Sequence, residues 1–230
     1  MPTPPSTLLR ADSLCHREQL RGISLAIETG RFTLISGAGA GALLRILGLL
    51  DRPDAGELWL EGQPTSALDD AARLELRNRA FGYIFEEPFL LNSFSVAENV
   101  AMPLFRISGY DIEQARNRTA QVLEFVGLMG AADSGVADLA LADHYRVALA
   151  RALAVAPRVL IADDAGLHIP AAEFRGYAAL LRSVPEALGL AVVATSAAGI
   201  FNPDREITLE AGCVASDTHP VPVEEAPAHE

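Results

Sequence analysis

Short apolar runs alternate with amphipathic stretches along most of the chain. The apolar runs have the length of buried strands and cover residues 23–30, 32–37, 56–62, 80–85, 158–164 and 190–196. Apolar positions at helical spacing predict helices over residues 43–50, 67–79, 111–128 and 145–155. Helices that alternate with buried strands are typical of a layered α/β domain with a parallel sheet. A mainly helical insert is expected around residues 105–140.

The two ends differ from this regular middle. Residues 1–7 and 216–230 are rich in proline and polar side chains and predict a flexible N-terminal tail and a disordered, acidic C-terminal tail. Residues 8–215 are expected to form one domain, with a helical subdomain at about residues 90–150. A chain of 230 residues is long enough to bury a sizeable core in one such domain.

The composition of the chain excludes several classes of protein function. The longest apolar stretch, residues 188–198, is interrupted by polar residues and is shorter than the roughly 20 residues that cross a bilayer, so we expect a soluble, cytoplasmic protein. The net charge of −12 argues against nucleic acid as a partner. Two cysteines exclude a disulfide framework. All 18 basic residues are arginine, which excludes every mechanism that needs a lysine.

Residues 32–53 have the outline of a phosphate-binding loop: a strand-like run, a glycine-rich turn and an apolar helix. Such a loop reads G-x-x-x-x-G-K-[ST], in which backbone amides hold the phosphates, the lysine contacts the β and γ groups, and the hydroxyl binds magnesium. The corresponding positions here are all small, namely Gly37, Ala38, Gly39, Ala40, Gly41 and Ala42. They supply neither cation nor hydroxyl, so an ordinary tight turn is favoured over a working phosphate site.

Three longer segments, taken in order, resemble the ATP-binding-cassette (ABC) ATPases, most closely those of lipoprotein-releasing and macrolide-efflux transporters. The segments are LLRILGLLDRPDAGELWLEG, FGYIFEEPFLLNSFSVAENVAMPL and YRVALARALAVAPRVLIADD. The likeness extends from about Leu8 to Val214. It implies a P-loop NTPase-like fold with a parallel core sheet, an N-terminal antiparallel β subdomain and a helical insert. It also implies that two ATPase chains face each other on a membrane permease, with each nucleotide between one chain's phosphate loop and the other's signature.

The departures from the family pattern fall on the chemistry. With the flanks aligned, the phosphate loop is about three residues short. The Q-loop glutamine corresponds to Glu86 and the switch histidine to Ser196. The Walker B aspartate matches Asp163, whereas the adjacent general-base glutamate is replaced by Asp164. Losing the lysine and the magnesium ligand together should cost several kcal/mol of nucleotide binding, because a unit charge at 4 Å interacts by about 4 kcal/mol at an effective dielectric of 20.

The signature motif L-S-G-G-Q is eroded as well. Its serine and two glycines correspond to Ala140, Leu141 and Ala142, so side chains block the close approach of a phosphate to the backbone. Both halves of a composite site are therefore lost. The resemblance then predicts a catalytically inactive pseudo-ATPase that acts as a structural or regulatory scaffold and needs no cofactor.

The partners that the resemblance implies are an integral membrane permease and a second ATPase-type subunit, either an identical chain or a paralogue. The permease is expected to contact an apolar segment, Pro88, Phe89, Leu90, Leu91 and Phe94. The protein would then lie peripherally on the inner face of the cell membrane.

Two alternatives remain open. The first is a weakly active ATPase that binds ATP with magnesium and drives transport together with a paralogue. Asp163 and Asp164 could hold magnesium in that case, although a hydrogen-bonded structural pair is favoured and His168 adds little to a metal site. The second is a dinucleotide-binding module, because the turn also fits G-x-G-x-x-A, with Glu57 or Glu61 as the ribose-binding acid.

Overall fold

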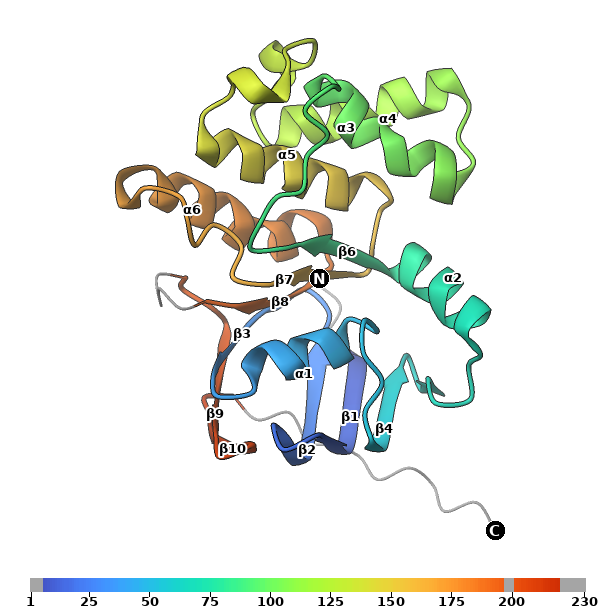
Figure 1. Ribbon diagram of the computed structural model, residues 1–230, viewed down its shortest axis with the longest axis vertical. Coiled ribbons are helices and arrows are strands. Elements are labelled where there is room, and N and C mark those ends of the chain that lie inside the picture. Colours follow the sequence, from blue (N-terminus) through green and yellow to red (C-terminus); the bar gives the residue numbers. More distant parts are fainter. Residues whose placement is uncertain (1–5, 197–200, 220–230) are drawn as a thin grey trace.

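The computed structural model describes residues 6–196 and 201–219, and its strands form two sheets (Figure 1). The smaller sheet has the strand order β2-β1-β4-β5 and is antiparallel throughout. Its strands are β1 (Thr7–His16), β2 (Leu20–Glu28), β4 (Ala55–Leu60) and β5 (Gln63–Pro64). This sheet is the N-terminal antiparallel β subdomain that the family resemblance implies.

The larger sheet has the order β10-β9-β3-β8-β7-β6. Its strands are β3 (Phe32–Gly37), β6 (Phe81–Ile84), β7 (Val159–Ala162), β8 (Ala191–Thr195), β9 (Arg205–Glu210) and β10 (Cys213–Asp217). All neighbours pair in parallel except β9 and β10 at the edge. Every residue of β7 and β8 is buried, which explains why these strands read as continuous apolar runs. The predicted parallel core sheet is confirmed.

Helices cover the larger sheet from both sides (Figure 1). They are α1 (Ala40–Leu47), α2 (Asp70–Ala80), α3 (Val96–Pro103), α4 (Ile112–Phe125), α5 (Leu141–Ala154) and α6 (Ala171–Leu188). A π-helical turn, η1 (Leu104–Ser108), extends α3, and two 3₁₀ turns, η2 (Met129–Ala131) and η3 (Val136–Asp138), precede α5. In the described part of the chain, no helix is long and apolar enough to span a membrane.

Two hydrophobic cores lie on opposite faces of the larger sheet. Alternate residues of β7 enter different cores, because successive side chains of a strand point to opposite faces. Leu160 and Ala162 pack with helices α3 to α6, whereas Val159 and Ile161 pack with α1 and the small sheet. The large sheet therefore lies between the helical part and the β subdomain, and the residues that follow its strands lie between these two parts as well.

The described residues at the inner ends of the two predicted tails lie in or beside strands. Strand β1 already begins at Thr7, and the hydroxyl of Ser6 lies 3.1 Å from that of Thr29. At the other end β10 continues to Asp217, whose carboxylate accepts two hydrogen bonds from the buried Arg205. The expected boundaries are therefore wrong at these positions, because edge pairing and a buried ion pair hold polar residues in the sheet. Residues 1–5 and 220–230 lie outside the described part.

Candidate functional site

Only two residues, Ala38 and Gly39, connect β3 to α1, since the strand ends at Gly37 and the helix begins at Ala40. Gly39 caps the helix in the left-handed conformation, with φ 99°, and no side chain caps the helix by a hydrogen bond. An anion at this turn would meet backbone amides of the first helical turn alone. A helix N-terminus of this kind favours negative charge, but without a cation it binds weakly.

The glycines of the turn pack against the backbone of the same chain. A β-carbon on Gly37, where φ is 89°, would lie 2.1 Å from the carbonyl oxygen of Leu209. A β-carbon on Gly39 would lie 2.7 Å from the carbonyl oxygen of Gln19. These positions require glycine because carbonyl groups approach them closely.

The arginine on α1 does not replace the missing lysine. Arg45 forms a two-pronged ion pair with Asp51, with Nε at 2.7 Å and Nη2 at 3.1 Å from the two carboxylate oxygens. The hydrogen bonds between them raise the pKa of Arg45 and lower the pKa of Asp51. Because Asp51 neutralises this guanidinium, little net positive charge is left for a nucleotide.

Asp163 and Asp164 follow β7 and share one hydroxyl group. Thr195 Oγ1 donates a hydrogen bond to Asp163 Oδ1 at 2.8 Å and accepts one from the backbone N–H of Asp164 at 3.0 Å. Burial raises the pKa of Asp163 above its ordinary value. In the described part of the chain, no group of three or more acidic, histidine or cysteine side chains could hold a metal ion. Thr195 therefore holds both residues in place directly after the end of β7.

Glu86, at the Q-loop position, is turned toward His168. The Nε2 atom of His168 lies 3.2 Å from Glu86 Oε1 and 3.7 Å from Glu87 Oε1. The hydroxyl of the buried Tyr145 donates a hydrogen bond to the backbone carbonyl of Glu86. The sequence places His168 near the Asp163 and Asp164 pair, and no local pattern indicates its contact with Glu86 and Glu87. That contact forms because β6 and β7 pair in parallel, which brings the segments after their ends together.

The signature-like segment forms the beginning of α5. Ala140 is the N-cap residue and provides no side-chain hydrogen bond, Leu141 is partly exposed, and Ala142 is buried. Asp143 lies in the first turn, and its carboxylate is 3.2 Å from Arg146. A carboxylate at this end of the helix interacts favourably with the helix dipole, which is the interaction that an active signature helix offers to a phosphate.

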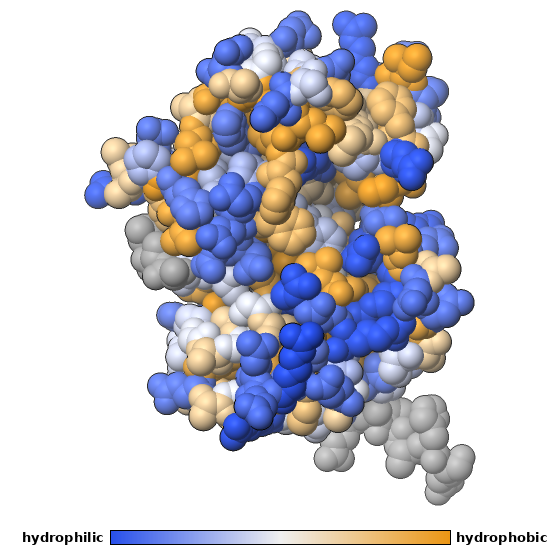
Figure 2. All heavy atoms as spheres, viewed as in Figure 1, coloured by the Kyte–Doolittle hydropathy of each residue, from blue (hydrophilic) through white to orange (hydrophobic). Residues whose placement is uncertain are grey.

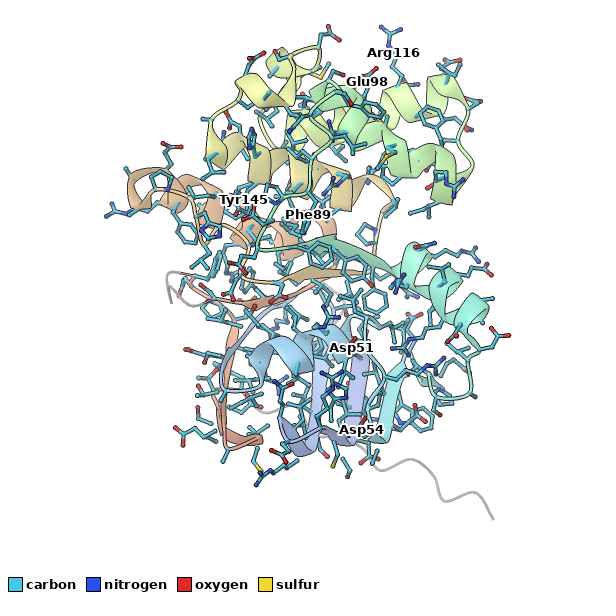
Figure 3. All side chains as sticks on the ribbon, in the orientation of Figure 1. Asp51, Asp54, Phe89, Glu98, Arg116 and Tyr145 are labelled. Atoms are coloured by element: carbon cyan, nitrogen blue, oxygen red, sulfur yellow. The ribbon has the colours of Figure 1, made fainter. Side chains whose placement is uncertain are left out.

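The segment expected to meet a permease forms an irregular loop, residues 86–95, which we call the docking loop. Its apolar side chains differ in exposure: Phe89 is 66% exposed, Leu91 40% and Phe94 38%, whereas Pro88 is buried and Leu90 half-buried. Figure 3 places Phe89 where the large sheet meets the helices above it. Figure 2 shows apolar side chains gathered in the upper half of the molecule, where the helices lie, above a mainly polar lower half.

Two side chains fix the backbone of the docking loop. The fully buried Asn99 accepts a hydrogen bond from the N–H of Leu91 at 2.8 Å and donates to the carbonyls of Leu91 and Ser95 at 3.1 and 3.0 Å. Arg151 donates to the carbonyls of residues 88 and 89, both at 2.7 Å. The exposed aromatic side chains therefore project from a backbone that the core holds in one conformation.

An apolar groove of about 420 Å³ lies between α3, α4 and η2 and begins at the first residues of α3, just after the end of the docking loop. Phe105, Ile112 and Met129 line it and are all partly or largely exposed. Glu98 and Arg116 also line it and bring one charge of each sign (Figure 3). The start of α3 joins the docking loop to the groove wall, because the N–H of residue 97 donates to the carbonyl of residue 132 at 2.9 Å.

Glu57 and Glu61, the acids expected to bind the ribose of a dinucleotide, form contacts within the protein. One Glu57 oxygen accepts hydrogen bonds from the backbone N–H groups of Leu58, Thr65 and Ser66, each at 3.1 Å. Glu61 pairs with Arg158. Since both carboxylates stabilise the fold around β4, the structure gives no support to the dinucleotide interpretation.

Known proteins were compared with the chain by sequence and by structure. Residues 20–166 match the ABC transporter family. The lipoprotein-releasing system ATP-binding protein LolD of Myxococcus xanthus is 39% identical over 177 residues, which cover 76% of this chain and 79% of LolD. The methionine import ATP-binding protein MetN of Thermobifida fusca is 40% identical over 177 residues, covering 76% of this chain and 54% of MetN.

Solved structures agree with the sequence matches. The dimeric ATP-binding cassette MJ0796, in a post-hydrolysis state bound to ADP and Pi, superposes with a TM-score of 0.79 at 26% identity, covering 91% of this chain and 97% of that one. The structure of cbiO1 from Clostridium perfringens has a TM-score of 0.81 at 20% identity, covering 92% and 88% of the two chains, which shows the shared fold. The family match covers more than half of the chain and LolD aligns over most of its length. The chain therefore belongs to the ABC transporter family, as an ATP-binding subunit of the LolD type.

Proposed function

We propose that this chain is a noncatalytic member of its family, a LolD-like subunit that docks on a membrane permease without hydrolysing ATP. The observation that carries the proposal is the two-residue turn between β3 and α1. A phosphate loop needs enough backbone to surround a phosphate, together with a cation and a hydroxyl. A turn of Ala38 and Gly39 provides none of these, and the nearby Arg45 is already paired with Asp51.

The second half of a composite site is affected in the same way. An intact signature could complete the site of a partner chain even where the phosphate loop has failed. Here α5 begins without a capping hydroxyl and carries Asp143 in its first turn, where it opposes the approach of a phosphate. This chain would therefore contribute to neither composite site of a dimer, whether the second ATPase-type subunit is an identical chain or a paralogue.

The surface that remains suited to function is the docking loop with its adjoining groove. Exposed aromatic side chains on a fixed backbone, beside an apolar groove, suit an amphipathic helix that lays its apolar face into the groove. We infer that this helix belongs to an integral membrane permease of the lipoprotein-releasing or macrolide-efflux type, as the LolD relatives suggest. The subunit would then lie on the inner face of the cell membrane and hold or restrain permease subunits.

Equilibrium titration with a fluorescent ATP analogue and magnesium tests the loss of nucleotide binding. Myxococcus xanthus LolD serves as the positive control. No saturable binding is expected for this chain up to about 1 mM, which corresponds to less than about 4 kcal/mol of binding free energy. A dissociation constant in the micromolar range would overturn the proposal and favour a weakly active ATPase instead.

A loop graft provides the matched variant. Replacing residues 37–42 with a family loop, G-x-x-x-x-G-K-S-T, restores the backbone length, the cation and the hydroxyl together. The grafted chain is expected to gain measurable Mg-ATP binding, whereas a graft of equal length made of glycine and alanine should not. Equal binding by both grafts would show that loop length alone, and not the missing charge, limits affinity.

Permease docking is tested by co-purification from membranes. Phe89→Asp places a charge on the most exposed aromatic residue of the docking loop, so the permease is expected to be lost. Leu188→Asp is the control, because Leu188 is 46% exposed at the end of α6 that leads into the start of β8. The docking loop follows the carboxyl end of β6, whereas Leu188 precedes the amino end of the parallel strand β8. The two positions therefore lie at opposite ends of the strands. Retention of the permease by the Phe89 variant would contradict the assignment.

A further inference from the structure

A histidine bridges two carboxylates at the start of the docking loop. His168 belongs to the segment between β7 and α6, and its Nε2 lies 3.2 Å from Glu86 Oε1 and 3.7 Å from Glu87 Oε1. All three side chains are about half exposed, at 46%, 53% and 64%. In the described part of the chain, no other basic group lies within ion-pair distance of these two carboxylates. The loop and the segment after β7 are thus joined by a contact that depends on charge.

The main chain of the loop is held by other groups. Tyr145 donates to the carbonyl of Glu86, while Arg151 and Asn99 hold the backbone farther along. These donors keep their charge state across the physiological pH range, and burial raises the pKa of Tyr145 to about 12. Imidazole, in contrast, is the side chain that changes charge between about pH 5 and 8. His168 is therefore the contact of the loop that a proton can modify.

We propose that His168 is a positioning residue for the docking loop, and that the proton on its imidazole sets how firmly the start of the loop is held. A protonated ring attracts both carboxylates. A neutral ring can donate to one carboxylate, and the second then repels the first. Deprotonation therefore loosens the loop. An effect of this contact on permease binding rests on the proposed docking function, since the same loop carries Phe89.

Two further acidic residues precede His168 on the same segment, Asp164 four residues before it and Asp163 five residues before it. Arg45 on α1 reaches Asp163 electrostatically but is paired with Asp51.

Hydrogen–deuterium exchange of the full chain tests the proposal. Exchange of the amides of residues 86–95 is measured at about pH 6 and about pH 8 and corrected for intrinsic rates. Wild type should exchange about two- to five-fold faster at the higher pH, the range that one exposed ion pair supplies. His168→Ala should exchange fast at both pH values. His168→Gln keeps a neutral donor, so it should be intermediate and independent of pH.

The matched control is His219→Gln. His219 is exposed and follows β10, which lies at the edge of the large sheet opposite to β6 and the docking loop. This variant should retain the wild-type pH response of residues 86–95. Equal exchange in wild type and His168→Ala at the lower pH would overturn the positioning role, and a pH response that persists in His168→Gln would overturn the role of the proton. The measurement needs no nucleotide or permease, so nucleotide binding and permease co-purification can fail or succeed independently of it.

Discussion

Three glycines that look equivalent in the sequence differ in what surrounds them. Gly37 and Gly39 have positive φ values and closely approach the carbonyls of Leu209 and Gln19. Gly41 lies in the first turn of α1, and a β-carbon there would meet nothing within 4 Å. Glycine is thus required at the first two positions by the packing of the fold, and at the third position it is replaceable.

Substitution by alanine separates these roles. Gly37→Ala is expected to lower the free energy of unfolding by about 2 kcal/mol or more, because a left-handed φ costs roughly 1–2 kcal/mol for a residue with a β-carbon and the Leu209 carbonyl must also move. Gly41→Ala, the control, should raise it by about 0.5–1 kcal/mol through helix propensity. Urea unfolding measures both. Equal effects at the two positions would contradict the packing role.

The pH dependence of stability follows from Asp163. Burial raises its pKa in the folded protein, so the folded state holds the proton more tightly than the unfolded state does. Its contribution is most favourable below the unfolded value of 3.8 and is lost as the pH rises through the folded pKa. Asp163→Asn should therefore stabilise the protein at neutral pH, by no more than about 1 kcal/mol because nearby water screens the charge.

Unfolding measured at neutral and at acid pH checks this expectation. The difference between Asp163→Asn and wild type should disappear at acid pH, where the carboxyl group of the wild type is protonated. Asp164→Asn provides a comparison at the neighbouring position. Destabilisation by Asp163→Asn at neutral pH would show that a cation holds this carboxylate ionised, as the weakly active ATPase interpretation requires.

At the scale of elements, the docking loop depends on α3 and α5 for its conformation. Asn99 is fully buried and bonds to backbone groups at both ends of residues 91–95. Helix α3 itself begins with a capping box formed by Ser95 and Glu98. The loop is therefore an extension of the helical core, although its side chains are exposed.

Removing the Asn99 side chain should loosen the loop and destabilise the fold. Asn99→Ala is expected to cost about 2–3 kcal/mol, because buried backbone groups of residues 91–95 lose their partner. Asn92→Ala, at an exposed position of the same loop, should change stability by less than about 0.5 kcal/mol. Denaturant unfolding gives both values. A loss at Asn92 as large as that at Asn99 would contradict the anchoring role.

Sequence patterns predicted the strands whose residues are nearly all buried. Strands β3, β7 and β8 are buried on both faces and read as apolar runs. Strand β1 was not predicted, because its register shifts relative to β2 between Ala11 and Leu14 and so its alternation is broken. Helix α6 was also missed, since it contains Gly176 and Pro185. Helix α1 ends three residues before the predicted end, because Leu49 adopts a left-handed conformation.

The candidate site was predictable only where it follows the order of the chain. The small residues of the turn are contiguous in the sequence, so the missing lysine and hydroxyl can be read there. The apolar side chains of the docking loop are also contiguous and can be read in the same way. The contacts of Glu86 with His168, and of Gln19 with Gly39, join distant segments. They depend on which strands become neighbours and on how the hairpin after β1 folds back, neither of which a local pattern specifies.

At the scale of the whole molecule, the family fold is retained, and the proposed loss of nucleotide binding rests on departures from the family motifs at separate places. The turn after β3, the start of α5 and the segment after β7 lie on different elements. A TM-score of 0.79 with the nucleotide-bound MJ0796 cassette shows that these local changes leave the architecture intact. Stability of this chain should therefore not depend on nucleotide.

Thermal unfolding with and without Mg-ATP measures this directly. A ligand present at 100 times its dissociation constant stabilises the folded state by about 2.7 kcal/mol, which raises Tm by roughly 5–11 °C in a protein of this size. At about 1 mM Mg-ATP we expect a shift below about 1 °C for this chain. Myxococcus xanthus LolD under the same conditions is the control. A shift of several degrees for both proteins would contradict the proposed function.

The short connection between β3 and α1 also limits which mutations could give this chain a phosphate-binding loop. Amino-acid exchanges alter side chains but leave the backbone the same length, and both glycines that could rearrange are held against neighbouring carbonyls. Under the proposed function, a gain of ATP hydrolysis therefore demands an in-frame insertion before any exchange becomes useful. A library of single substitutions, screened for rescue of cells that lack an active LolD-type subunit, should then yield no survivors.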